Sequence, residues 1–181
     1  MSEDEDRRAF TWAMHHRSRD MAPRIAKNIN LRGINTLLDL GGGPGTYALA
    51  LLEKWPKLHG TVADRPAALD VAQAVARKHH AGKRLSYLPL NFMTEPIPGH
   101  YDVIFLSNVI HIYSANENLS LLKKIKTALN PGGRIIIQDF FLWDKKGLQP
   151  TETSLFAVTM LLYTDTGNTY TAQEVLSLIH I

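Results

Sequence analysis

The sequence predicts an α/β fold with a doubly wound parallel sheet. From residue 36 to residue 139, short apolar runs alternate with helical patterns, as in consecutive βαβ units. The first of these runs leads directly into a glycine-rich turn at residues 41–45. The chain has 181 residues, 45% of them hydrophobic. This is enough for the core of one domain and too little for two domains with a core each.

Five strands are expected between the helical patterns. Their ranges are Thr36–Leu40, Leu58–Ala63, Arg84–Pro89, Asp102–Ser107 and Arg134–Asp139. Each is short and rich in leucine or β-branched residues, which is typical of parallel strands that are buried on both faces. The sheet is therefore expected to have a Rossmann-like arrangement.

Helices are expected at both ends of the chain and between most strands. The first 30 residues predict one or two helices. Apolar residues at helical spacing predict three more helices, through Leu69, Ala72, Val75 and Ala76, through Leu119, Leu122, Ile125 and Leu129, and through Leu155, Val158, Thr159 and Leu162. The run Asn130-Pro131-Gly132-Gly133 is expected to end the second of these before the last strand begins.

Charge and composition narrow the function classes. The net charge of +3 is mild, and the basic stretches at residues 7–27 and 77–84 lack the interleaved aromatics of a nucleic-acid groove, which favours solvated helix faces. The absence of cysteine excludes disulfides, thiolate metal sites and a cysteine nucleophile. No metal site is expected, because the adjacent pairs His15-His16 and His79-His80 cannot share one helix face.

The beginning of the chain is acidic at Ser2–Asp6, unlike a signal peptide, and no apolar run is long enough to cross a bilayer. A cytoplasmic protein without membrane or nucleic-acid partners is expected.

The glycine turn is the sharpest motif. It reads Leu37-Leu38-Asp39-Leu40-Gly41-Gly42-Gly43-Pro44-Gly45-Thr46, and Pro44 suits the first turn of a following helix. Such a turn serves a dinucleotide or S-adenosylmethionine, or else is only a structural turn with a capping aspartate. Thr46 stands where the dinucleotide fingerprint has glycine or alanine, and Asp39 would lie close to a pyrophosphate. The cationic amino and sulfonium groups of S-adenosylmethionine suit Asp39 better.

Asp64 ends the second predicted strand, where both classes of cofactor enzyme place an acid that accepts the ribose hydroxyls. The structural alternative is a helix cap before Arg65-Pro66.

Several motifs together resemble class I methyltransferases. They are the glycine turn, Val62-Ala63-Asp64-Arg65-Pro66 and Leu129-Asn130-Pro131-Gly132-Gly133-Arg134. Phe10-Thr11-Trp12-Ala13-Met14 and Val109-Ile110-His111-Ile112-Tyr113-Ser114 resemble, more narrowly, the O-methyltransferases that include caffeate, acetylserotonin and bacterial pigment and polyketide enzymes. The resemblance covers nearly the whole chain.

This resemblance implies how the cofactor S-adenosylmethionine is bound. Gly41 and Gly43 would line its methionine portion, and Asp64 would hold the ribose. Ser107 takes the place of a lysine that contacts the cofactor in many plant members.

For adenine, the resemblance implies that Phe92 packs on the ring and that Asn91 bonds its amino group or a ring nitrogen. Asn91 departs from the family's acidic residue, although an amide oxygen can still accept that bond. The alternative for Phe92 is an ordinary core aromatic.

The resemblance also implies that His111 is the general base and that Asp139 orients it. A near-neutral pKa suits histidine to taking a proton from a phenol or enol. The family's second supporting acid is replaced by Thr169, and a purely structural histidine is the alternative. Met14, Phe156 and Met160 either line the substrate pocket or pack in the core.

The implied activity is methyl transfer to a hydroxyl of a small, aromatic or polycyclic metabolite. The alternatives are a related C- or N-methyltransferase, a noncatalytic cofactor-binding module, and a nicotinamide-dependent oxidoreductase, which Asp39 and Thr46 disfavour.

Compared with this family, the chain is expected to be a fragment. Residues 1–30 would be a helical lead-in and residues 31–175 a truncated methyltransferase domain. An N-terminal domain that makes the parent enzyme a homodimer would be absent, as would a C-terminal antiparallel strand pair beside the fifth strand. Residues 176–181 match the translation of a common transposon sequencing adaptor and are expected to be a non-native tail.

Overall fold

The computed structural model describes residues 2–144 and 146–179, which form alternating strands and helices. The strands are β1 (Thr36–Leu40), β2 (His59–Asp64), β3 (Leu85–Pro89), β4 (Tyr101–Ser107), β5 (Leu129–Gln138), β6 (Phe141–Leu142) and β7 (Tyr170–Thr171). The α-helices are α1 (Glu3–Ser18), α2 (Ala22–Asn28), α3 (Thr46–Lys54), α4 (Pro66–Ala76), α5 (Ala115–Thr127), α6 (Thr151–Tyr163) and α7 (Ala172–Ile179). Two short 3-10 helices, η1 and η2, span His80–Arg84 and Ile110–Ile112.

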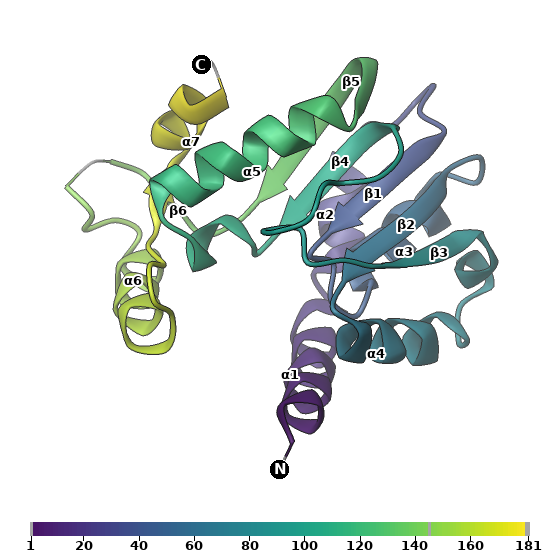
Figure 1. The fold of residues 1–181 in the computed structure, drawn as a ribbon, viewed down its shortest axis with the longest axis horizontal. Helices are drawn as coiled ribbons and strands as arrows, with labels where there is room; N and C mark the ends of the chain where they lie inside the picture. Colours follow the sequence, from purple (N-terminus) through teal and green to yellow (C-terminus); the bar gives the residue numbers. More distant parts are fainter. Residues whose placement is uncertain (1, 145, 180–181) are drawn as a thin grey trace.

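The central sheet has five parallel strands in the order β3-β2-β1-β4-β5, which confirms the predicted α/β fold (Figure 1). The chain moves outward from β1 to β3 and then returns to β4 on the other side of β1. The carboxyl ends of β1 and β4 therefore flank the point at which strand order reverses. In open α/β sheets, ligands bind at that point.

Both faces of the sheet are buried, as successive residues of one strand point to opposite sides. Leu37 and Phe105 join a core with side chains of α2, α3 and α4. Leu38 and Ile104 join a second core with side chains of α5. This division confirms that the sheet is doubly wound. The stripe of Leu69, Ala72, Val75 and Ala76 on α4 is buried as predicted.

Four of the five predicted strands have bounds that differ by one to five residues, and two boundaries change the interpretation of a motif. The helix α5 ends at Thr127, and Leu129 already pairs with Tyr101 as the first residue of β5. The Asn130–Gly133 run therefore interrupts the register of β5 rather than ending the helix, because regular pairing resumes only at Arg134. At the glycine turn, α3 begins at Thr46 after Gly45, so Pro44 precedes the helix instead of forming its first turn.

The helix predicted after the sheet is present as α6, but its apolar stripe is largely exposed. Leu155, Val158 and Leu162 are 64%, 54% and 73% exposed. The buried residues of α6 are Thr153 and Met160, which lie on a different face. Spacing correctly predicted the helix but not the direction in which this stripe points. Figure 1 shows α6 and α7 beside the β5 end of the sheet, away from β3.

The two ends of the chain contribute helices. The predicted lead-in contains α1 and α2, and α1 packs against α4. Residues 176–179 of the expected tail belong to α7, whereas residues 180–181 lie outside the described residues. Within the described ranges, β5 is an edge of the five-stranded sheet. None of the helices in those ranges is long and apolar enough to cross a membrane.

The fold predicts that Phe105→Ala lowers the free energy of unfolding by about 3–5 kcal/mol, because Phe105 is fully buried in β4 and its ring contacts Tyr47 edge-on. Urea denaturation followed by circular dichroism measures the change. Leu155→Ala, at an exposed position, is the control and should change stability by less than about 0.5 kcal/mol. Similar losses in both variants would contradict the assignment of the core.

Candidate functional site

The loops after β1, β3 and β4 meet at the carboxyl edge of the sheet. A Cβ atom added to Gly41 would lie 2.9 Å from Cγ2 of Val109 and 3.2 Å from Cε1 of Phe92. These three residues follow three different strands, so the turn after β1 contacts both other loops. The fold thus brings the glycine turn and the predicted adenine contact together at the reversal point of the strand order.

The glycines of the turn have conformations or neighbours that exclude a side chain. Gly41, Gly43 and Gly45 have φ values of 70°, 51° and 67°, in the left-handed region that L residues rarely adopt. A Cβ at Gly42 would lie 2.5 Å from Cγ of Asp39. The main chain can therefore pass directly over the end of β1 and leave room for a ligand above it.

Asp39 lies beneath this turn and is completely buried. Neither carboxylate oxygen has a hydrogen bond of standard geometry, although the nearby Ala48 N–H partly offsets the effect of burial. Burial, with a smaller contribution from the charge of Asp64, raises the pKa of Asp39 to about 7. Gly42 lies directly against this carboxylate, and the expected role of Asp39 beside a cationic ligand stays a prediction.

Asp64 connects the turn to the end of β2. Its Oδ2 accepts a hydrogen bond from the Gly43 N–H at 2.9 Å, and its Oδ1 accepts one from the Arg65 N–H at 2.7 Å. Burial raises the pKa of this carboxyl group above its usual value. The N-cap of α4 is Arg65, so Asp64 is not the helix cap that was its structural alternative. Each oxygen retains capacity for another hydrogen bond.

Phe92 lies half-buried between the glycine turn and Tyr113. Its ring meets that of Tyr113 edge-on, with centroids 6.3 Å apart. The Nζ of Lys124, on α5, donates to the carbonyls of Phe92 and Met93 and fixes the loop. The half-buried ring is placed where an adenine could stack on it. The side-chain amide of Asn91, also half-buried, has no hydrogen bond to any residue within 2–144 or 146–179.

Neither Tyr113 nor Lys124 was predicted to be a site residue, although Tyr113 belongs to the motif at residues 109–114. Burial and, to a smaller extent, the charge of Asp64 raise the pKa of the Tyr113 hydroxyl, so this tyrosine lies near both Phe92 and Asp64. The signal available in the sequence was its place directly before the capping residue Ser114 of α5. Lys124 could not be identified in the same way, because lysine is common on exposed helix faces.

Ser107 belongs to a polar network at the ends of β4 and β5. Its hydroxyl donates to Oε1 of Gln138 at 2.5 Å and accepts from Nδ2 of Asn108 at 3.1 Å. Asn108 has φ of 57°, which is uncommon for a residue other than glycine and marks a tight change of direction. The network directs the hydroxyl proton of Ser107 to Gln138, and the expected contact of Ser107 with the cofactor stays a prediction.

His111 and Asp139 form a buried pair at the ends of β4 and β5. Nδ1 of His111 lies 2.6 Å from Oδ1 of Asp139, with side-chain exposures of 9% and 2%. The Asp139 carboxylate also accepts hydrogen bonds from the N–H groups of Ile110 and Phe140. An ionised carboxylate can only accept hydrogen bonds, so Nδ1 carries the proton and the lone pair remains on Nε2. This arrangement fits an oriented general base.

Aromatic rings surround this histidine. Phe156 lies edge-on to His111 with centroids 4.8 Å apart, and Phe140 lies 4.4 Å from Phe156. Phe156 was expected to line a substrate pocket or to pack in the core, and it lies against the candidate base. Met160 is buried and Met14 is half-buried, and their place in a substrate pocket or in the core stays a prediction.

The loop that contains Thr169 packs on the same turn. The Asn168 N–H donates to the His111 carbonyl at 2.9 Å, and a Cβ at Gly167 would lie 2.6 Å from that oxygen. Thr169 is buried, and its hydroxyl has no hydrogen-bond partner in the described parts of the chain. Asp139 is therefore the acid that contacts His111, and the neighbours of Thr169, Asn168 and Gly167, pack on the turn.

Comparison with known proteins gives a consistent result. A family model described as O-methyltransferase domain matches residues 1–180. The 3-hydroxy-5-methyl-1-naphthoate 3-O-methyltransferase of Streptomyces sahachiroi is 30% identical over 154 residues, which are 84% of this chain and 44% of that relative.

Solved structures show the same relationship. An O-methyltransferase family 2 protein from Planctomyces limnophilus, in complex with apigenin, matches with a TM-score of 0.92 and 29% identity, covering 99% of this chain and 55% of that one. The S-adenosylmethionine-dependent methyltransferase SibL matches with a TM-score of 0.79 and 26% identity over 92% and 49% of the two chains. The chain spans about half the length of these proteins.

The environment of Asp39 predicts a specific pH dependence of stability. The pKa of the Asp39 carboxyl group is about 7 in the folded protein, compared with an ordinary value of 3.8, so folding favours its protonated form. Stability is then lost as the pH rises from about 4 to about 7. Between about pH 5 and pH 8, the wild-type chain should lose roughly 2–3 kcal/mol that Asp39→Asn does not lose. Urea denaturation at both pH values measures this. Asp165→Asn, at an exposed position, should retain the wild-type slope.

Proposed function

Because this chain belongs to the O-methyltransferase domain family, we propose that the complete protein transfers a methyl group from S-adenosylmethionine to a hydroxyl of a small aromatic or polycyclic metabolite. The observation that carries this proposal is the buried His111–Asp139 pair, at the same edge of the sheet as the glycine turn and Asp64. A base and a nucleoside site at adjacent strand ends are what such a transfer requires.

The residues at this edge fit the proposed cofactor. Asp64 has lone pairs left for ribose hydroxyls, and Phe92 offers a half-buried ring for adenine, with the Asn91 amide beside it. Gly43 leaves the main chain of the turn open to the methionine portion, whereas Gly41 lies against Val109 and Phe92. When bound, S-adenosylmethionine supplies an electrophilic methyl group on a sulfonium centre.

Buried Asp39 bears on the cofactor through its charge. When it is ionised, above its pKa of about 7, its negative charge below the turn lowers the energy of a nearby cation and raises that of a pyrophosphate. The preference for S-adenosylmethionine over a dinucleotide therefore depends on the electrostatic interaction between Asp39 and the ligand on the other side of the turn. It does not require a direct contact.

His111 has the arrangement needed to activate the acceptor. Nε2 takes the proton from the acceptor hydroxyl, which leaves the oxygen more nucleophilic. The Asp139 carboxylate keeps the proton of Nδ1 in place, and its negative charge stabilises the imidazolium that forms. Phe140 and Phe156 exclude water on one side of the ring and provide flat apolar surface for an aromatic acceptor. The names of the naphthoate enzyme and the apigenin complex support an aromatic acceptor.

We expect the 181-residue chain to bind S-adenosylhomocysteine and not NAD in isothermal titration. Asp64→Asn should weaken S-adenosylhomocysteine binding by about tenfold or more, because the amide replaces a charged acceptor of ribose hydroxyls. Asp165→Asn is the matched control and should bind as the wild type does. Binding of NAD alone would overturn the cofactor assignment, and absence of binding by a folded sample would contradict it.

The pairing with Asp139 predicts the tautomer of His111. Long-range ¹H–¹⁵N correlation spectra should show the neutral His111 ring protonated on Nδ1, with His111→Gln used to assign the signals. In Asp139→Asn, the amide can rotate and donate to Nδ1, so a population protonated on Nε2 should appear. Asp165→Asn should leave the spectrum unchanged. A wild-type ring already protonated on Nε2 would rule out the proposed base.

A further inference from the structure

Arg17, near the end of α1, differs from the other arginines of this helix. Arg7 pairs with Glu3, and Arg8 forms an ion pair with Asp70 on α4. No carboxylate among the described residues lies within 4.0 Å of the Arg17 guanidinium. Its central carbon instead lies 5.5 Å from the centroid of the Phe140 ring. An exposed cation over an aromatic ring gains little stability, so the stacking alone gives a weak reason for this placement.

The position of Phe140 makes Arg17 relevant to the acceptor. Phe140 directly follows Asp139, and its ring lies 6.3 Å from that of His111 and 4.4 Å from that of Phe156. The guanidinium and the candidate base thus border the same aromatic ring. An aromatic molecule packed against Phe140 and Phe156 could reach both groups.

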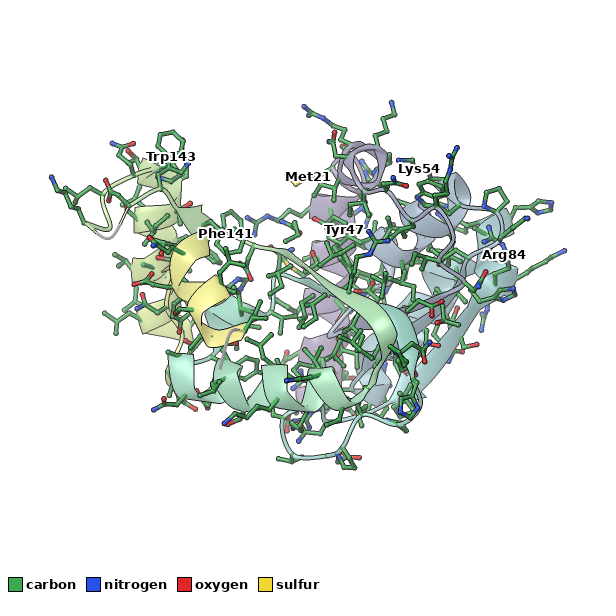
Figure 2. All side chains as sticks on the ribbon, turned by 90° about the horizontal axis from the view of Figure 1, so that it is seen from above. Met21, Tyr47, Lys54, Arg84, Phe141 and Trp143 are labelled. Atoms are coloured by element: carbon green, nitrogen blue, oxygen red, sulfur yellow. The ribbon has the colours of Figure 1, made fainter. Side chains whose placement is uncertain are left out.

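Arg17 also faces the beginning of α3. Its positive charge acts on Tyr47 and partly offsets the burial that raises the pKa of that tyrosine. In Figure 2, Tyr47 lies near α1, whereas Phe141 and Trp143 lie on the side of α6. Arg17 therefore stands at the carboxyl edge of the sheet, between the helix that follows the glycine turn and the strand end that carries Asp139.

We propose that Arg17 recognises the acceptor by binding a carboxylate attached to its aromatic ring. The inference rests on the proposed methyl transfer and specifies its acceptor as an aromatic hydroxy acid. A guanidinium matches a carboxylate with two parallel hydrogen bonds, which fixes the orientation of the ring as well as its position. With the carboxylate held at Arg17 and the ring against Phe140, the hydroxyl is directed to Nε2 of His111.

Two observations favour this ligand over a neutral one. The Arg17 side chain is exposed, and no carboxylate within residues 2–144 and 146–179 pairs with it, so binding an acid breaks no ion pair among those residues. The name of the Streptomyces sahachiroi relative describes a hydroxylated naphthoate, which combines the aromatic ring, the acid and the hydroxyl in one molecule. A carboxylate of the methyl donor is the competing partner, and the experiment separates the two.

The test compares an acid with its neutral ester. The probes are 3-hydroxy-1-naphthoate, a simplified form of the compound named in that relative, and its methyl ester. Both are titrated into the wild-type chain and the Arg17→Gln and Arg19→Gln variants, with and without S-adenosylhomocysteine. The wild type should prefer the acid by about tenfold, and Arg17→Gln should lose this preference. Arg19 caps the C-terminus of the same helix, and Arg19→Gln is the control that should retain the preference.

The outcomes distinguish this proposal from the proposed function. A wild-type chain that binds S-adenosylhomocysteine but does not prefer the acid overturns the role of Arg17. Weaker S-adenosylhomocysteine binding by Arg17→Gln in the absence of any acceptor also overturns it, because the guanidinium then holds the donor. Failure of the wild type to bind S-adenosylhomocysteine contradicts the cofactor, while the titrations without it still test the preference for the acid.

Discussion

Two strand-end carboxylates, those of Asp64 and Asp139, accept hydrogen bonds from the backbone of neighbouring loops, and the geometry of the site depends on these bonds. Parallel strands end with unpaired N–H groups at one edge of the sheet, which must find acceptors. Asp64 binds the Gly43 N–H of the turn after β1. Asp139 binds the Ile110 N–H after β4 together with the ring of His111. Each aspartate thus fixes the loop that follows the adjacent strand. Asp64 keeps lone pairs for a ligand, and Asp139 orients the ring of His111.

The glycine turn buries the Asp39 carboxylate, and this burial is unfavourable for folding. Because Gly42 has no side chain, the turn can lie directly on Asp39, and the carboxylate is left without a well-formed hydrogen bond. A buried polar group in this state destabilises the folded protein. A residue that served stability alone would be apolar here. The placement is understandable if a cation occupies the far side of the turn, since the field of a buried carboxylate is little screened by water.

Much of this arrangement could be predicted from the sequence, because each strand and the motif at its end form one short contiguous segment. The five strands followed from short apolar runs, and Asp64 could be chosen because it ends a predicted strand, whereas the roles of His111 and Asp139 came from the resemblance to O-methyltransferases. Contacts between distant segments could not be predicted in this way. The Ser107–Gln138 bond depends on the register of β4 with β5, and the exposed stripe of α6 depends on how that helix is placed beside the sheet.

The cofactor side and the acceptor side of the site also differ in where their residues lie in the sequence. The residues assigned to the cofactor follow β1, β2 and β3, consecutive strands that a shared core fixes against α3 and α4. The residues around His111 come from distant places, with Arg17 in α1 and Phe156 in α6. Substitutions of exposed residues such as Arg17 can therefore change the acceptor surface without disturbing the sheet core. The two sides are still joined, because the turn after β1 contacts Val109 and α1 packs against α4, so only exposed positions of α1 and α6 can vary independently of the cofactor site.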